Sequence, residues 1–233
     1  NRGGLCRVAL GVLRVGETTH QASTNVLAEG TYYGIGLMGG FTDTQDTKRD
    51  PAQTTPITTS SDSSNLSGGA AVWLGYDLYP KYGIPLRTEL ATSFRSRHDF
   101  NVLFTQASPG NSLYGAKSNV QTTDFMVSLL WDIPNIPLRS RFKPYIGGGV
   151  GVVYIDSDTD GFTPTPSYAR DNRWNSAWQA QAGMTYAYST KLDIRFDYRY
   201  IDLGDISTGR LASGDRFTTH LTSHDLRIGV EWK

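Results

Sequence analysis

Alternation of apolar and polar side chains, repeated in eight segments, is the feature that most constrains this chain. In residues 192–200, Leu, Ile, Phe and Tyr side chains alternate with Asp and Arg. Successive side chains of a strand point to opposite faces, so a strand separates the two sets, whereas a helix mixes them. The sequence therefore predicts an all-β fold. The eight segments are 33–41, 72–78, 86–95, 123–133, 146–154, 177–188, 192–200 and 225–232.

The connections between these segments alternate between long and short. Long polar loops are expected at about 44–66, 99–118, 156–173 and 204–219, with short turns between them. In an up-and-down meander every second connection lies at the same end, so the long loops share one rim and both termini lie at the other. We expect one eight-stranded antiparallel up-and-down barrel over 29–233. Residues 1–28 would form an N-terminal extension, in which 5–15 has the pattern of a short amphipathic helix.

Composition excludes several other classes of protein. The 22 Lys and Arg residues balance the 22 Asp and Glu residues, which disfavours a basic nucleic-acid binder. Aromatic residues make up 12% of the chain and charged residues only 19%, which is not typical of disorder. A single cysteine rules out an intrachain disulfide framework. No apolar run of 18 residues is present, which excludes a transmembrane helix but leaves a transmembrane barrel, half polar by construction.

Volume decides which face of the strands points outward. A soluble lipocalin-like barrel would place the apolar face inside, but an eight-stranded interior is barely wide enough for side chains. The polar face here carries glycines and opposite charges, which suit a narrow lumen. Aromatic residues concentrate near the strand ends, as expected for girdles at two membrane interfaces. The expected girdle residues are Tyr33, Phe41, Tyr76, Phe94, Trp131, Tyr154, Trp178, Tyr188 and Trp232.

Two strands carry motifs of a known family. The sequence KPYIGGGVG at 143–151 resembles the KPYxGxGxG strand of small outer-membrane barrels, and DYRYIDLGD at 197–205 resembles their YRYxDLG strand. The chain thus resembles the opacity-type, OmpA-like surface-antigen group, often labelled the porin family. The resemblance implies an eight-stranded transmembrane β-barrel in a Gram-negative outer membrane, with long loops extracellular and termini periplasmic.

This location also sets the expected partners. They are outer-membrane lipid and lipopolysaccharide, and another envelope or surface protein bound through the loops or through residues 1–28. No nucleic acid is expected. The function we expect is structural or surface interaction, as an adhesin, antigen or docking partner, without enzymatic activity.

Ten charged residues on the polar faces should point into the lumen. Because desolvating a lone charge costs several kcal/mol, they are expected to pair in a salt-bridge network that fills the barrel. The alternative interpretation is a narrow porin for small solutes or ions, with these charges lining the pore. The ten residues are Arg87, Glu89, Arg95, Asp193, Arg195, Asp197, Arg199, Asp225, Arg227 and Glu231.

The third long loop contains the first half of a calcium-loop pattern. Asp156, Asp158 and Asp160 precede Gly161 in the order D-x-D-x-D-G. The twelfth position is Ser167, where a bidentate Glu is expected. We therefore expect a solvated acidic loop, with a weak calcium site as the alternative and no other cofactor.

Two histidines raise a second functional alternative. His220 and His224 lie at the mouth of the last strand, where lipid-modifying outer-membrane enzymes place a His and a Ser. The spacing differs from the His-x-Ser of lipid A deacylases, since Thr222 stands in the place of the serine. Such an enzyme would require His220 or His224 to bind both a hydroxyl and a carboxylate.

Overall fold

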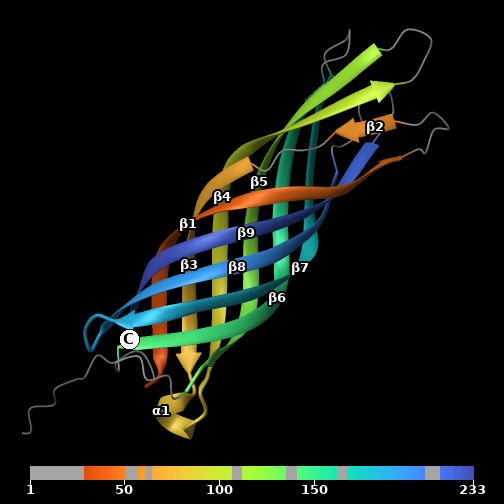
Figure 1. Ribbon diagram of the computed structural model, residues 1–233. Helices are drawn as coiled ribbons and strands as arrows, with labels where there is room; N and C mark the ends of the chain where they lie inside the picture. The colour runs from red at the N-terminus through yellow and green to blue at the C-terminus, as the bar shows by residue number, and fades with distance from the viewer. Residues whose placement is uncertain are drawn as a thin grey trace, which may run out of the picture.

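The described chain forms a closed antiparallel β-barrel with one short helix (Figure 1). The computed structural model describes residues 29–50, 57–60, 65–106, 112–134, 141–161, 167–207 and 216–233. The extension 1–28 and its expected helix lie outside these residues. Within them, no helix has the length and apolar character needed to cross a membrane.

The strands are long and follow one another along the chain. Their bounds are β1 Thr31–Asp50, β2 Ile57–Ser60, β3 Asn65–Asp77, β4 Leu86–Gln106, β5 Ser112–Asp132, β6 Phe142–Gly161, β7 Ser167–Ala187, β8 Leu192–Ser207 and β9 Arg216–Trp232. The helix α1 is a single turn, Tyr79–Tyr82, between β3 and β4. It ends at Gly83, whose φ of +67° is open to glycine at little cost.

Pairing of neighbours confirms the predicted eight-stranded up-and-down barrel. The order is β1-β3-β4-β5-β6-β7-β8-β9, and β9 returns to β1 with Trp232 opposite Tyr33. Full closure leaves no unpaired edge within the barrel wall. The short strand β2 stands outside this ring and pairs with Leu103–Gln106 of β4.

The two ends of the barrel differ in construction. One end, here called the turn end, carries α1, the connections 133–141 and 188–191, and the C-terminus (Figure 1). At the other end, the hairpin end, β4 and β5 project well beyond the ring of strands (Figure 1). The two sets of connections expected from the sequence thus fall at opposite ends of the barrel, but strand pairing takes up much of the stretches that were expected to be long loops.

The strands extend further toward the hairpin end than the sequence predicted. The stretch 99–118 was expected to be a loop, but β4 continues to Gln106 and β5 begins at Ser112. Likewise β6 and β7 occupy most of 156–173, and strand enters both 44–66 and 204–219. Beyond the membrane the outer face meets water, so the apolar alternation disappears while the backbone ladder persists. Polarity alone therefore placed the loop boundaries wrongly.

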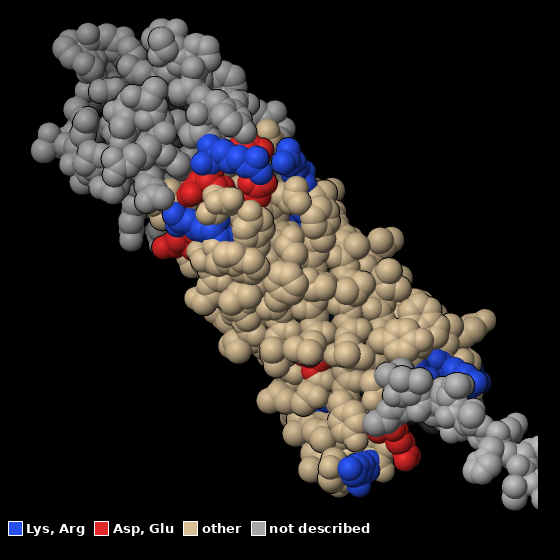
Figure 2. All heavy atoms as spheres, turned by 180° about the vertical axis from the view of Figure 1, so that it is seen from behind, with Lys and Arg blue, Asp and Glu red and all other residues tan. Residues whose placement is uncertain are grey.

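Apolar side chains cover the outside of the barrel between its two ends. They remain exposed in the isolated chain; Leu37 and Leu226, for example, are each 68% exposed. Figure 2 shows a broad surface almost free of charged atoms, with bands of Lys, Arg, Asp and Glu at both ends. We call this surface the apolar belt; its exposed members include Ile35, Leu37, Val72, Leu74, Leu90, Val127, Leu129, Ile146, Val150, Leu226 and Ile228.

Glycines make room for large side chains inside the barrel. A Cβ on Gly34 would lie 2.5 Å from the ring of Trp73, and one on Gly36 would lie 3.1 Å from it. Gly75 leaves space for Tyr32 in the same way. The interior is therefore packed by alternating very large and very small residues, as its narrow diameter requires.

Candidate functional site

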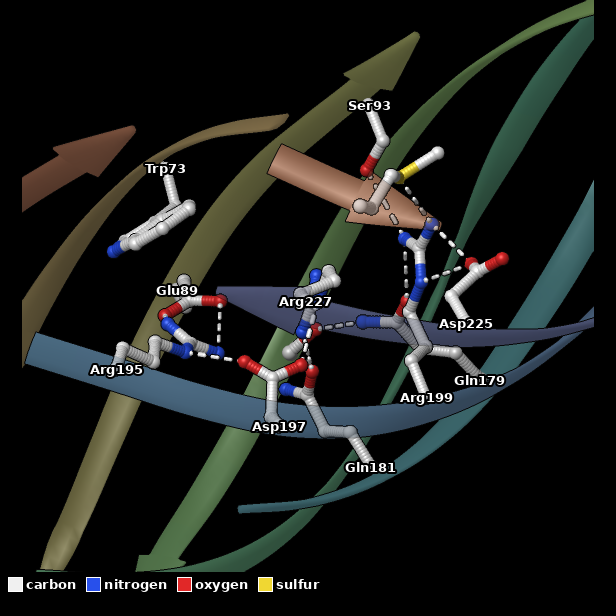
Figure 3. A network of polar contacts seen from close by, with 12 residues as sticks. Trp73, Glu89, Ser93, Gln179, Gln181, Arg195, Asp197, Arg199, Asp225 and Arg227 are labelled. Carbon is white, nitrogen blue, oxygen red and sulfur yellow. Dashed lines mark hydrogen bonds and ion pairs between the residues drawn. The ribbon is translucent and has the colours of Figure 1, made fainter. Parts of the chain in front are cut away.

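The ten charged residues expected in the lumen all lie inside the barrel with their side chains buried. They come from β4, β8 and β9. The members of this set that Figure 3 labels point toward one another across the interior. These strands place alternate residues inward, so each contributes a row of charges two positions apart. The rows meet in three successive groups between the turn end and the hairpin end.

Arg87 organises the group nearest the turn end. Its guanidinium donates to the Asp132 carboxylate at 2.8 Å and lies against the rings of Tyr32 and Tyr145. Close by, the ammonium group of Lys233 forms an ion pair with Asp193. These contacts close the lumen at the level where it opens toward the turn end.

Arg195 lies at the centre of the second group. It donates to Glu89 at 2.6 Å and to Asp197 at 2.8 Å (Figure 3). It also donates to Glu231 at 3.2 Å. The same guanidinium lies over the ring of Trp73, whose Nε1 donates to Glu231 at 3.1 Å. One arginine thus connects strands β3, β4, β8 and β9.

Arg199 and Arg95 form the third group with two shared carboxylates. Arg199 donates to Asp225 at 2.8 Å and to Asp124 at 3.2 Å. Arg95 contacts the same Asp124 and Asp225 from the opposite wall. Arg227 lies between the second and third groups and donates to Asp197 of the second group at 2.5 Å.

Buried apolar side chains form a cluster inside the barrel, mostly on the hairpin side of these charges, and we call it the apolar layer. Its side chains are almost completely buried and come from β5, β6, β7, β8 and β9. Along these strands the layer offers no polar group to water or to a hydrated ion. The layer consists of Val120, Met126, Val153, Ile155, Ala177, Ile201, Leu203 and Leu221.

Charge is balanced through the section. Among the described residues, the buried charged side chains are five arginines and six carboxylates, and the Asp193 pair with Lys233 adds a sixth cation. The arginines come from three strands and the carboxylates from four, so no wall carries a single sign. This arrangement fills space and fixes strands to one another. It does not line an open pathway of one sign, as an ion-selective pore requires.

Several partners in this network were missing from the sequence prediction. Asp124 and Asp132 share the polar face of 123–133, so the alternation that exposed the other charges could also have found them. Gln181 of β7 accepts from Arg227, and Trp73 is the large ring beneath Arg195. The alternation places both on the inward face, but it does not show which arginine each of them meets, because that depends on which strand lies across the barrel.

The expected girdle residues lie on the outer face or at its margins. Six of the nine are exposed, and Tyr33 stacks on Trp232 with ring centroids 5.6 Å apart. At the hairpin side Tyr154 contacts Trp174, which the sequence prediction did not include. The exposed six are Tyr33, Phe41, Phe94, Trp131, Trp178 and Tyr188.

The acidic run expected in a loop lies instead in β6. Asp156 and Asp158 point outward, and each forms ion pairs with both Arg97 and Arg170. In an extended strand the carboxylates stand in a row and cannot converge as in a calcium loop. The side chain of Asp160 lies outside the described set. Within that set, no group of three acidic, His or Cys side chains could hold a metal ion.

The two histidines lie on the outer face of β9. His220 has a carboxylate at each ring nitrogen, Asp205 at 2.9 Å from Nδ1 and Asp202 at 3.1 Å from Nε2. The hydrogen bond with Asp205 is the main cause of a raised pKa for His220, which stands beyond the apolar belt. His224 shares a 2.5 Å hydrogen bond with the Tyr198 hydroxyl.

The contacts of the two histidines differ from those of a hydrolase in particular ways, although His224 has both a hydroxyl at hydrogen-bond distance and the Asp43 carboxylate 4.0 Å from its Nε2. The arrangement predicted for a lipid-modifying enzyme pairs one histidine with both a hydroxyl nucleophile and a carboxylate. Both nitrogens of His220 face carboxylates, and the hydroxyl at His224 belongs to a tyrosine.

Comparison with known proteins agrees with this architecture. The family model for the outer membrane protein beta-barrel domain matches residues 10–233. The chain belongs to this family. The expected relationship to small outer-membrane barrels is therefore confirmed, and with it the location in a Gram-negative outer membrane.

Relatives of this beta-barrel family member come from several bacteria. The chain is 29% identical to outer membrane protein PagN of Salmonella typhimurium over 177 residues, 70% of this chain and 72% of PagN. It is 27% identical to an uncharacterised protein of Brucella abortus over 183 residues, 70% of this chain but 62% of that protein. Neisserial surface protein A has a similar fold, with a TM-score of 0.51 and 16% identity over 88% of this chain and 97% of that one.

Proposed function

We propose that this protein is a closed outer-membrane barrel that serves as a rigid base for an extracellular interaction surface. The observation that carries the proposal is the filling of the lumen by three successive groups of ion pairs and by the apolar layer. A barrel filled in this way holds its shape without conducting. Its function then resides at its exposed end, where binding usually occurs on rigid scaffolds.

Strand length supports a role at the cell surface. β4, β5 and β7 each have 21 residues, whereas crossing a bilayer takes about 9–11 residues of a tilted strand. About half of each strand therefore stands beyond the apolar belt as paired, water-exposed sheet. We infer that the hairpin end faces outward from the cell and that the aromatic residues at the two margins of the belt mark the membrane interfaces.

The environment of the rim histidines supports a non-enzymatic role. Carboxylates occupy both sides of the His220 ring, so neither nitrogen is directed at a nucleophile. The hydroxyl at His224 belongs to Tyr198, where a lipid-modifying enzyme of this kind would have a serine.

Conductance of the full-length protein in a planar bilayer tests the closed lumen. We expect no discrete current steps, with a general porin in the same bilayer as the positive control. Steady steps that appear at every insertion would contradict closure and would favour the narrow porin.

A loop-exchange experiment tests the surface role. Segments 107–111, 162–166 and 208–215 are replaced with short Gly-Ser linkers, and adhesion of bacteria displaying each variant to host cells is counted. We expect adhesion to fall while the amount of folded barrel stays constant. Replacing 135–140 at the turn end is the matched control, and an equal loss in both variants would contradict the proposal.

A further inference from the structure

An apolar groove runs along the outside of the barrel across β3, β4 and β5. Its volume is about 420 Å³, and its exposed walls are Val72, Leu74, Leu90, Phe125 and Val127. The groove lies within the apolar belt, where the barrel meets hydrocarbon. A groove at this depth is bathed in acyl chains, so its natural occupant is the tail of a lipid.

A charged cluster stands on the same face, beyond the hairpin side of the groove. It consists of Arg97, Arg170, Asp156 and Asp158, and we call it the arginine cap. The arginine side chains are 57% and 56% exposed, whereas those of Asp156 and Asp158 are only 14% and 18% exposed. The guanidinium groups therefore cover the carboxylates, and the surface presented to the surroundings is positive although the cluster is neutral.

A bulge in β4 aims Arg97 into this cap. The β4–β5 register shifts between Arg95 and His98, so Arg95 points into the lumen while Ser96 and Arg97 are both exposed. Bulges commonly redirect a side chain in this way. Arg97 then reaches across β5, donating to Gln121 at 3.4 Å and contacting Asp158 at 3.5 Å.

The spacing between groove and cap matches a membrane lipid. Arg97 follows Thr92 of the groove by five residues, so the two residues lie about 16 Å apart along an extended strand. Their separation along the membrane normal is smaller, because the strands are tilted. Half of a hydrocarbon core is about 15 Å thick. A lipid whose phosphate lies at the cap therefore has its chain in the groove. Figure 2 shows the charged band directly bordering the uncharged surface on this side of the molecule.

We propose that the groove and the arginine cap together form a binding site for a phosphorylated lipid of the outer leaflet, of the lipid A class. The guanidinium groups hold its phosphate through charge-assisted hydrogen bonds, and the groove holds one acyl chain. Arginine suits this role because its planar fork matches phosphate oxygens.

Native mass spectrometry of the full-length protein with bisphosphorylated lipid A tests the site. We expect wild type to retain the lipid and Arg97→Gln/Arg170→Gln to weaken its binding by about tenfold or more, the scale of one lost charged hydrogen bond. Lys81→Gln/Lys143→Gln removes the same charge at the turn end and should bind like wild type. Unchanged binding by the arginine variant, or equal loss in both variants, overturns the proposal.

A second pair of variants tests the groove. Thr92→Trp fills it, and Ala180→Trp adds the same bulk to the outer face of β7, away from it. Only Thr92→Trp should reduce lipid retention, with folding of both checked by heat-dependent mobility on gels. Two further outcomes are distinguished in the same mass spectra.

If millimolar inorganic phosphate displaces the lipid, the site binds free anions. If Thr92→Trp loses a dimer but still binds the lipid, the groove is a surface for a second copy of the chain. Either result overturns the proposal.

Discussion

At the scale of single residues, the glycines of β6 show how narrow the interior is. A Cβ on Gly149 would lie 2.6 Å from the Val127 carbonyl oxygen, far inside van der Waals contact. Gly148, one position earlier, faces outward, and its added Cβ would meet only the Gln179 carbonyl oxygen at 3.4 Å. Because successive residues face opposite sides of the strand, Gly149 is needed for packing of the interior, whereas Gly148 can be replaced by a larger residue.

Alanine substitution tests that difference. Gly149→Ala should lower the free energy of unfolding by about 1–3 kcal/mol, because overpacking forces strands apart. Gly148→Ala should change it by less than about 0.5 kcal/mol, as a surface substitution does. Urea unfolding in lipid vesicles, followed by tryptophan fluorescence, measures both. Equal effects at the two positions would contradict this account of the packing.

Arg199 provides a second residue-scale prediction. Arg199→Ala leaves Asp124 and Asp225 sharing only Arg95, so the barrel should lose about 3–5 kcal/mol of unfolding free energy. Arg97→Ala on the outer face should cost at most about 1 kcal/mol, since exposed ion pairs contribute little. The same urea titration compares them. A smaller loss for Arg199→Ala than for Arg97→Ala would show that the lumen network does not stabilise the barrel.

At the scale of elements, β-bulges punctuate the strands where they leave the membrane. Register shifts occur in β1 between Gln45 and Lys48, in β4 between Arg95 and His98, and in β8 between Asp202 and Gly204. In β8 the shift occurs at Gly204, whose φ of +74° would be strained for a residue with a side chain. The bulge lets both Asp202 and Asp205 face His220, so a local irregularity builds a polar contact between strands.

The β8–β9 contact at His220 should depend on pH. His220 can donate a hydrogen bond to both carboxylates at once only when both ring nitrogens carry a proton, that is, when the imidazole is charged. The hydrogen bond with Asp205 raises the pKa of His220. Because the folded pKa is the higher one, the stabilisation is complete below the ordinary value near 6.5 and fades as pH rises through the raised value. On β1, the carboxylate of Asp43 lies 4.0 Å from His224 and is the other acidic group on this face.

An NMR titration of the histidine rings measures this effect. Wild-type His220 should titrate above the usual histidine range, and Asp205→Asn should bring its pKa down. Amide protection near His220, after correction for the intrinsic rise of exchange with pH, should fall as His220 loses its proton in wild type and change less in Asp205→Asn. Asp43→Asn is the control, since that residue faces His224. An unshifted His220 in wild type would contradict the contact.

At the scale of the whole molecule, the charged residues fall into two classes, those buried in the lumen and those exposed on the outer face. Arginine–carboxylate pairs in the lumen are shielded from solvent, whereas the arginine cap and the His220 contact meet water and headgroups. The unfolding free energy should therefore change by less than roughly 1 kcal/mol between 0.1 M and 1 M salt, because buried pairs are screened little. Lipid A retention, by contrast, should fall with salt. Unfolding titrations at the two salt concentrations measure the first effect, and a steep salt dependence would mean that water enters the lumen.

Much of this architecture follows from period-2 alternation and the lengths of the connections. In 192–200 the alternation assigns each residue to a face, because a strand offers only two, and the small bore of eight strands sends the charges inward. That reasoning yielded the fold, the ten lumen charges and the outward aromatics. It failed in 99–118, where the sequence has no apolar alternation but the backbone pairing of β4 and β5 continues.

The sequence by itself therefore determined the eight strands, their order and the face that each residue occupies within the alternating segments. Only the tertiary structure decided which charges meet, because Arg195 and Glu89 lie on strands that are far apart in the chain and face each other only after closure. Only the structure also shows that Arg97 points outward although Arg95, two residues before it, points into the lumen. A bulge between Arg95 and His98 shifts the register, and strict alternation does not predict a bulge. Pairing across a closed barrel is a property of its radius and stagger, which no single strand encodes.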